Sequence, residues 1–232
     1  MSNIVISGTY CTGKTTLSLA LEKATGISTT HALTMREILP MLYPGKSLRQ
    51  CSYAELITLG MRRFADRIQA EAKLPSGFIS DGCPLQEWLY GSTRLITGAY
   101  PDEYPWKMKL KKFWHYNSYR DFEKLLKGFE GMVKAYTRSH YDLFFHLPVE
   151  FPFVADGHRP TSPQFRIESE KRLLATYTEM GISPVILSGS LEERIGKVLN
   201  LLQITPEYPI AYYIRHAALE RRARFDAVKL ET

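Results

Sequence analysis

The residues whose types and spacing suggest chemistry most directly lie near the N-terminus, where the chain reads Gly8-Thr-Tyr-Cys-Thr-Gly13-Lys14-Thr15. A glycine, four residues and a Gly-Lys-Thr triplet form the pattern of a phosphate-binding loop. The glycines let backbone N–H groups point at phosphate oxygens, and a following helix adds the positive end of its dipole. We predict that Lys14 reaches the β and γ phosphates of ATP and that the Thr15 hydroxyl coordinates Mg²⁺. The predicted nucleotide-binding residues of the loop are Gly8, Thr9, Tyr10, Cys11, Thr12, Gly13, Lys14, Thr15 and Thr16.

A second reactive group is the carboxylate of Asp81, which ends a short run of mostly apolar residues. Phosphoryl transfer to a hydroxyl uses a carboxylate near the γ phosphate, either to orient or deprotonate the acceptor or to hold the metal. In a parallel sheet the ligand crevice lies outside the carboxyl ends of the strands, so Asp81 should face the phosphate loop. We therefore predict that Asp81 is a catalytic residue and a metal ligand. The alternative is that Asp81 only caps the helix that starts near Pro84.

Arginines follow the next two expected strands. Arg159 lies between Gly157 and Pro160, and Arg166 lies at the start of the next helix. A loop there can place arginines over the transferring phosphate, where they stabilise charge in the transition state. We predict this catalytic role for Arg159, whereas Arg166 is equally well explained as a surface charge paired with nearby glutamates. Arg194 is a candidate to pack near the purine of ATP, although Ser190 and the acids after it also form an ordinary helix start.

The elements that must position these groups alternate between strands and helices. Short apolar runs predict buried strands at residues 4–6, 78–81, 141–147 and 184–188. Apolar residues at helical spacing predict helices over residues 14–23 and about 53–72, each followed by glycine or proline. Strands that alternate with helices predict a mostly parallel sheet in a three-layer α/β fold.

Length and composition describe one folded domain. The chain has 232 residues, of which 44% are hydrophobic and 23% charged, so disordered and coiled-coil classes are excluded. We expect a single domain over residues 1–232. Lys and Arg number 30 against 24 for Asp and Glu, and the net charge of +6 favours partners such as nucleotides or nucleic acid. Three scattered cysteines and the lack of any long apolar stretch predict a cytoplasmic protein without membrane contact.

Several of these segments follow one another in a familiar order: the phosphate loop, Asp81-Gly82, the Asp-Gly-His-Arg-Pro segment at 156–160, and Ser188 to Arg194. With them, the sequence resembles over about residues 1–202 the P-loop ATPase and kinase family that includes the nicotinamide riboside kinase domain. Thymidylate and deoxynucleoside kinases are more distant relatives of that family. The resemblance implies a nucleoside- or nucleotide-kinase fold, ATP and Mg²⁺.

For the individual residues, the resemblance implies that Lys14 and Thr15 serve the phosphates and the metal. It also implies that Asp81 acts as base or metal partner and that Arg159 belongs to a lid. Thymidylate and deoxynucleoside kinases usually carry an arginine directly after the strand-end aspartate, whereas Gly82 follows Asp81 here. The substrate pocket of those kinases therefore does not carry over to this chain.

Two segments stand outside the alternation of strands and helices. A tail at about residues 205–232 predicts an extra helix with a solvated basic face. An insert at about residues 100–120 interleaves aromatic residues with Lys107, Lys109, Lys111 and Lys112. Such an insert can bind single-stranded nucleic acid or extruded bases, cap a small aromatic substrate, or pack its aromatics inward with the lysines in solvent. Resembling proteins of some bacterial viruses phosphorylate hydroxymethylated bases within DNA.

The sequence as a whole predicts a kinase that transfers the γ-phosphoryl group of ATP to a hydroxyl of a nucleoside-like or nucleotide-like small molecule. One alternative is a kinase that acts on a hydroxymethylated base within DNA. A second is a regulatory ATPase whose hydrolysis drives a change of shape. The acceptor, the choice of ATP or GTP and the oligomeric state stay open at this stage.

Overall fold

The computed structural model describes residues 2–100, 102–152 and 162–226. Arg159 lies outside these residues, and so does the side chain of Lys111. The helices are α1 (Lys14–Thr25), α2 (Met35–Leu42), α3 (Tyr53–Ala72), α4 (Leu85–Thr97), α5 (Pro105–Trp114), α6 (Tyr116–His140), α7 (Pro163–Glu179), α8 (Leu191–Leu202) and α9 (Ile210–Asp226).

The strands are β1 (Asn3–Ser7), β2 (Phe78–Asp81), β3 (Leu143–His146) and β4 (Val185–Ile186). They form a parallel sheet in the order β2-β1-β3-β4. The third and fourth strands are shorter than predicted. The fourth, β4, is an edge strand that pairs only with Phe145 and His146. A short edge strand leaves few unpaired backbone groups for another chain to join.

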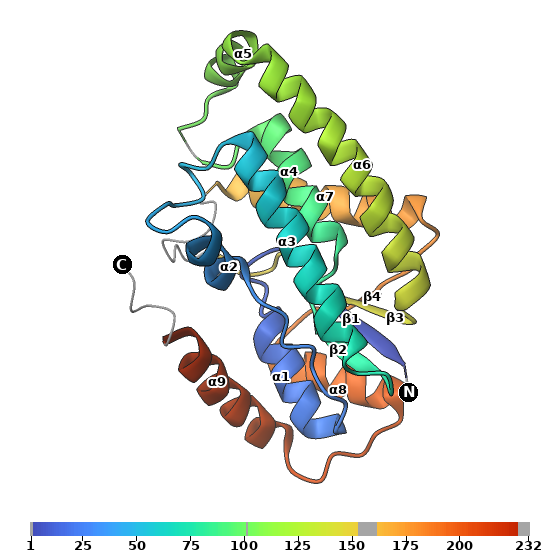
Figure 1. The fold of residues 1–232 in the computed structure, drawn as a ribbon. Helices are drawn as coiled ribbons and strands as arrows, with labels where there is room; N and C mark the ends of the chain where they lie inside the picture. Colours follow the sequence, from blue (N-terminus) through green and yellow to red (C-terminus); the bar gives the residue numbers. More distant parts are fainter. Residues whose placement is uncertain (1, 101, 153–161, 227–232) are drawn as a thin grey trace.

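Helices cover both faces of the sheet, so the predicted three-layer α/β fold is confirmed (Figure 1). The alternation of side chains along a strand sends Val5 into a core with α3, α4, α6 and α7, and sends Ile4 and Ile6 into a core with α1, α8 and α9. All three of these side chains are buried. Residues 4–6 are therefore all apolar because both faces of this strand pack into a core, as expected of a parallel strand.

The register of the sheet brings two predicted site segments together. Ile6 of β1 pairs with Asp81 of β2, and Ser7 pairs with His146 of β3. The phosphate loop leaves β1 at this edge of the sheet. The strands that flank β1 are β2 on one side and β3 on the other. Ligands of open parallel sheets bind at such a point, outside the carboxyl ends of the strands.

The insert and the tail are helical. Helices α5 and α6 form a hairpin whose tip extends away from the sheet, and α9 lies beside α1 (Figure 1). Within the described residues, no helix combines the length and the apolar character needed to cross a bilayer.

Candidate functional site

The phosphate loop begins at a glycine that no other residue can replace without a clash. Gly8 has φ of 140°, and a Cβ atom built on it would lie 2.6 Å from the carbonyl oxygen of Leu147. That oxygen belongs to backbone and cannot rotate away. The chain then turns through Cys11 (φ 58°) and Gly13 (φ 95°) before α1 begins at Lys14. These left-handed residues produce the tight strand-to-helix turn that the sequence pattern predicts.

Side chains of Gln86, Arg166 and Arg194 from outside the loop, and of Thr12 within it, hold the carbonyl oxygens of the loop. The donors are Gln86 to Gly8, Thr12 to Thr9 (2.9 Å), Arg166 to Tyr10 and Cys11 (3.1 and 3.2 Å), and Arg194 to Thr12 (2.9 Å). The C=O and N–H of one planar peptide point in opposite directions. Where an outside donor holds a carbonyl, the amide hydrogen of the same peptide is directed away from that donor, which is the arrangement that an anion-binding nest requires.

The two arginines in this set are buried, with 3% of each residue exposed. Arg166 was a candidate to cover the transferring phosphate, but its guanidinium is used on the loop carbonyls and on the carbonyl of Phe151 at 2.8 Å. Arg194 donates to Thr12 and to the carboxylate of Glu150 at 2.7 Å, and its predicted contact with the purine stays a prediction. The alternative was that Ser190 and the acids after it form an ordinary helix start. It is confirmed in part, because Ser190 caps α8.

The lysine of the loop lies over the loop itself. Lys14 Nζ donates to the carbonyl of Thr9 at 2.6 Å. An incoming phosphate oxygen would compete with that carbonyl for the ammonium group. Thr15 and Thr16 follow on the first turn of α1 and line the same cavity as Lys14.

The backbone around Asp81 is fixed by a fully buried arginine. Arg67 of α3 donates to Ser80 Oγ at 2.8 Å, to the Asp81 carbonyl at 3.3 Å and to the Gly82 carbonyl at 3.0 Å. Burial opposes the charge of Arg67, but the neighbouring carboxylate of Glu87 in particular raises the pKa of the guanidinium above its ordinary value. Arg67 thus remains charged and anchors the end of β2.

Local packing explains why the residue after Asp81 is a glycine. Gly82 has φ of 102°, and a Cβ there would lie 3.2 Å from Nη2 of Arg67. A side chain at residue 82 would therefore press on the guanidinium of Arg67, which explains why a glycine follows Asp81.

Asp81 lines the cavity, and its carboxylate is not used as a helix cap. The N-cap of α4 is Pro84, without a side-chain cap hydrogen bond. Among the residues that the structure describes, none donates a hydrogen bond to the Asp81 carboxylate or to the Thr15 hydroxyl. Both side chains line one cavity. Two oxygen ligands of this kind, open on the same cavity as a phosphate loop, fit the preference of Mg²⁺ for oxygen.

The cavity has a volume of about 230 Å³ and continues from the phosphate loop into the space between α3 and α4. Its wall includes residues that sequence reasoning missed, namely Thr34, Met35, Leu56, Arg63, Gln86, Glu87, Tyr90, Arg94, Phe122, Leu126 and Arg221. Two signals were present in the sequence. Gln86 and Glu87 follow Asp81 within two helical turns, and Arg63 and Arg67 lie four residues apart on one helix face.

The tail contributes to the site, which corrects the expectation of a wholly solvated basic face. Arg221 lines the cavity. Arg224 donates to the carbonyl of Ala32 at 3.1 Å and lies 3.4 Å from Glu37 of α2. Helix α9 therefore packs on α1 and also contacts the segment that forms one side of the cavity.

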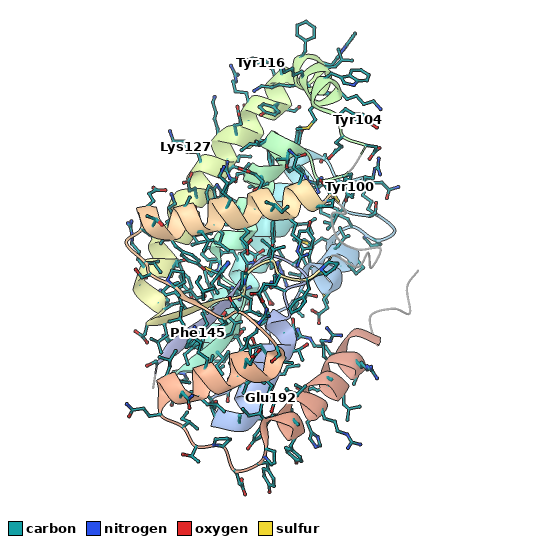
Figure 2. All side chains as sticks on the ribbon, turned by 180° about the vertical axis from the view of Figure 1, so that it is seen from behind. Tyr100, Tyr104, Tyr116, Lys127, Phe145 and Glu192 are labelled. Atoms are coloured by element: carbon teal, nitrogen blue, oxygen red, sulfur yellow. The ribbon has the colours of Figure 1, made fainter. Side chains whose placement is uncertain are left out.

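The aromatic residues of the insert are divided between core and solvent. Tyr119 at the start of α6 is buried, and Phe122, just beyond the insert, is buried and lines the cavity. Trp106, Leu110, Phe113 and Trp114 of α5 are 63%, 51%, 79% and 73% exposed. Figure 2 shows the tip of the hairpin around the labelled Tyr116, far from the labelled Phe145 in the core. The interpretation that the insert packs its aromatic residues inward is therefore wrong for α5.

A strand, a glycine-rich loop with Lys14 and Thr15, a following helix and a parallel sheet define the class of P-loop nucleotide-binding domains. The chain belongs to the AAA domain family, whose match covers residues 3–194. No curated protein matches the chain.

A solved structure with a similar fold is the crystal structure of NadR protein in complex with NR. The two share 19% sequence identity at a TM-score of 0.60, and the match covers 89% of this chain. It covers 53% of the NadR chain, so this chain spans about half the length of that protein.

Proposed function

We propose that the protein is an ATP-dependent kinase that phosphorylates a hydroxyl of a nucleoside-like or nucleotide-like acceptor. The observation that carries the proposal is that Lys14, Thr15 and Asp81 line one cavity, which continues past them between α3 and α4. A nucleotide at the loop and an acceptor in the continuation would meet at Asp81. The structural likeness to NadR, which was solved with NR, supports a small nucleoside-like molecule as acceptor.

In this proposal the acceptor oxygen forms a bond to the γ phosphorus while the bond from that phosphorus to the β–γ bridging oxygen breaks, and ADP leaves. The nest of amide hydrogens and Lys14 hold the phosphates in place, which orients the γ phosphate toward the cavity. Asp81 accepts the proton of the acceptor hydroxyl or orients that hydroxyl. Thr15 and Asp81 would hold Mg²⁺, which neutralises phosphate charge when bound. Arg159 is proposed as the arginine that closes over the transition state.

The proposal is tested by following the γ phosphate. The full chain is incubated with Mg²⁺ and γ-labelled ATP, with mixed nucleosides and nucleotides in one tube and with DNA that carries natural or hydroxymethylated bases in another. We expect label on a small molecule. Lys14→Ala should reduce transfer by at least about 10²-fold, the scale of losing one charge-stabilising donor, while the far-UV spectrum stays unchanged. Free phosphate as the only product in both tubes would favour the regulatory ATPase.

A second candidate is a kinase for a base within a nucleic acid, and the exposed face of α5 favours it. Trp106, Leu110, Phe113 and Trp114 follow a 4-3-1 spacing, which places them on one side of the helix. Four lysines and no acidic residue share this helix. Aromatic side chains among lysines stack bases and neutralise phosphates. Label retained on DNA, together with loss of DNA affinity in Trp114→Ala and weaker binding at higher salt, would support this candidate.

A further inference from the structure

The polar groups that line the inner part of the cavity are mostly engaged with the protein itself. Gln86 donates to the Gly8 carbonyl and accepts from the amide of Cys83 at 2.9 Å, so both ends of its amide are used. Glu87 accepts from Arg63 at 3.0 Å and from Arg67 at 3.3 Å, and 7% of the residue is exposed. A neutral base would find few free partners in these two side chains.

After these pairs are formed, the wall of the cavity carries more positive than negative charge. Its cationic residues are Lys14, Arg63, Arg94 and Arg221, and its acidic residues are Asp81 and Glu87. Glu87 is matched by two arginines. Lys14 and Asp81 belong to the phosphate-loop end described above. The continuation of the cavity therefore has a surplus of positive charge.

Arg94 of α4 is the cation that best fits a ligand there. Throughout the described parts of the chain, no carboxylate forms an ion pair with Arg94, and no hydrogen bond of its guanidinium is formed. The guanidinium lies 5.6 Å from the centre of the Tyr100 ring, which restricts its position. Glu103, an acid of the loop that follows α4, accepts from the amides of Ala99 and Tyr100. Arg94, whose guanidinium carries five N–H donors, thus lines the cavity without an ion pair to a described carboxylate.

We propose that the acceptor carries a phosphate group of its own and that Arg94 binds this phosphate. The inference rests on the proposed kinase function and specifies its substrate class as a nucleotide, either free or within a strand. A planar guanidinium donates two parallel hydrogen bonds to phosphate oxygens, and partial burial strengthens them. The cavity thereby selects the charge of the acceptor and not only its shape.

The test compares matched acceptors with labelled ATP and the full chain. Each nucleoside is paired with its 5′-monophosphate, and a third arm uses short single-stranded oligonucleotides of the same bases. We expect kcat/KM to be at least about 10-fold higher for the phosphate-bearing member of the best pair, the scale of a charged hydrogen bond. Arg94→Gln should raise the KM for that acceptor about 10- to 100-fold while the KM for ATP and kcat change little.

Two further variants separate a bound phosphate from a structural effect. Arg94→Lys keeps the charge without the paired donors and should recover part of the lost affinity. Arg62→Gln removes an exposed charge from α3 and should leave every constant unchanged. Isothermal titration of the corresponding nucleoside monophosphate into wild type and Arg94→Gln gives the same comparison without catalysis.

The outcomes are distinct. Equal use of a nucleoside and its monophosphate, unaffected by Arg94→Gln, would overturn this inference and leave the kinase proposal standing. ATP hydrolysis without transfer to any acceptor, with no monophosphate binding by titration, would overturn both. Transfer only to oligonucleotides, weakened by Arg94→Gln, would support a strand as the source of the phosphate.

Discussion

The guanidinium of Arg67 contacts the backbone carbonyl of Asp81, with 3.3 Å from Nη1 and 3.4 Å from Nη2 to the oxygen. Arg67 thus fixes the main chain at the end of β2 and leaves the Asp81 side chain for the cavity. The same guanidinium bonds Ser80 and Glu87, so one buried cation joins α3, β2 and α4. The position of Asp81 in the candidate site therefore depends on a buried residue that does not itself line the cavity.

We predict that Arg67→Met destabilises the protein by about 3–5 kcal/mol, because removal of one partner leaves buried carboxylate and carbonyl groups without their donor. Urea unfolding at neutral pH measures the change. Arg62→Met, an exposed neighbour on the same helix, should stay within about 0.5 kcal/mol of wild type. A loss below about 1 kcal/mol for Arg67→Met, the cost of an ordinary hydrogen bond, would contradict an anchoring role.

Local patterns predicted the loop, the strand-to-helix alternation and the place of Asp81, since each depends on residues close in sequence. The role of Arg166 could not be predicted, because its contacts with Tyr10 and Cys11 join positions about 155 residues apart. Periodicity also gave no sign that the aromatic residues of α5 face solvent, since an amphipathic stripe looks the same whether it is covered or exposed.

Asp81→Asn should lower the rate of phosphoryl transfer by about 10²-fold or more, because the amide cannot accept the proton of the acceptor hydroxyl. The variant keeps the shape of the side chain, and its backbone contacts with Arg67 are unaffected. Steady-state turnover and ATP titration are measured together. Asp66→Asn is a poor control because Asp66 accepts from the amide of Leu33, so Asp121→Asn, an exposed position of α6, is used instead. Near-normal turnover of Asp81→Asn would mean that Asp81 is not the acid-base group.

Arg166→Gln should weaken ATP binding by about 10-fold, the scale of one charged hydrogen bond, because the carbonyls of Tyr10 and Cys11 lose their common donor. The acceptor KM should change far less, since Arg166 faces the loop and not the space between α3 and α4. Titration with ATP and acceptor saturation curves separate the two effects. Lys171→Gln, an exposed charge on the same helix, is the matched control. An unchanged ATP affinity would show that the loop keeps its shape without Arg166.

The pair formed by His31 and Glu22 should make stability depend on pH near neutrality. His31 Nε2 lies 3.4 Å from the Glu22 carboxylate, and the hydrogen bond to Glu22 raises the pKa of His31 although burial opposes it. Glu220 adds to the rise and Arg224 reduces it. A group whose pKa is higher in the folded state binds its proton more tightly there. Its contribution is therefore complete below the unfolded pKa of about 6.5 and is lost as pH rises through the folded value.

His31→Asn tests this dependence, because asparagine tolerates the left-handed backbone of residue 31, whose φ is 48°. Urea unfolding of wild type and variant is measured at several pH values from about 5.5 to 9, a range that brackets the ordinary histidine pKa. The free energy of unfolding of wild type should exceed that of the variant most at the acidic end, and the difference should shrink as pH increases. A difference that stays constant across the range would show that the charge of His31 does not stabilise the fold, and that residue 31 matters only through its backbone.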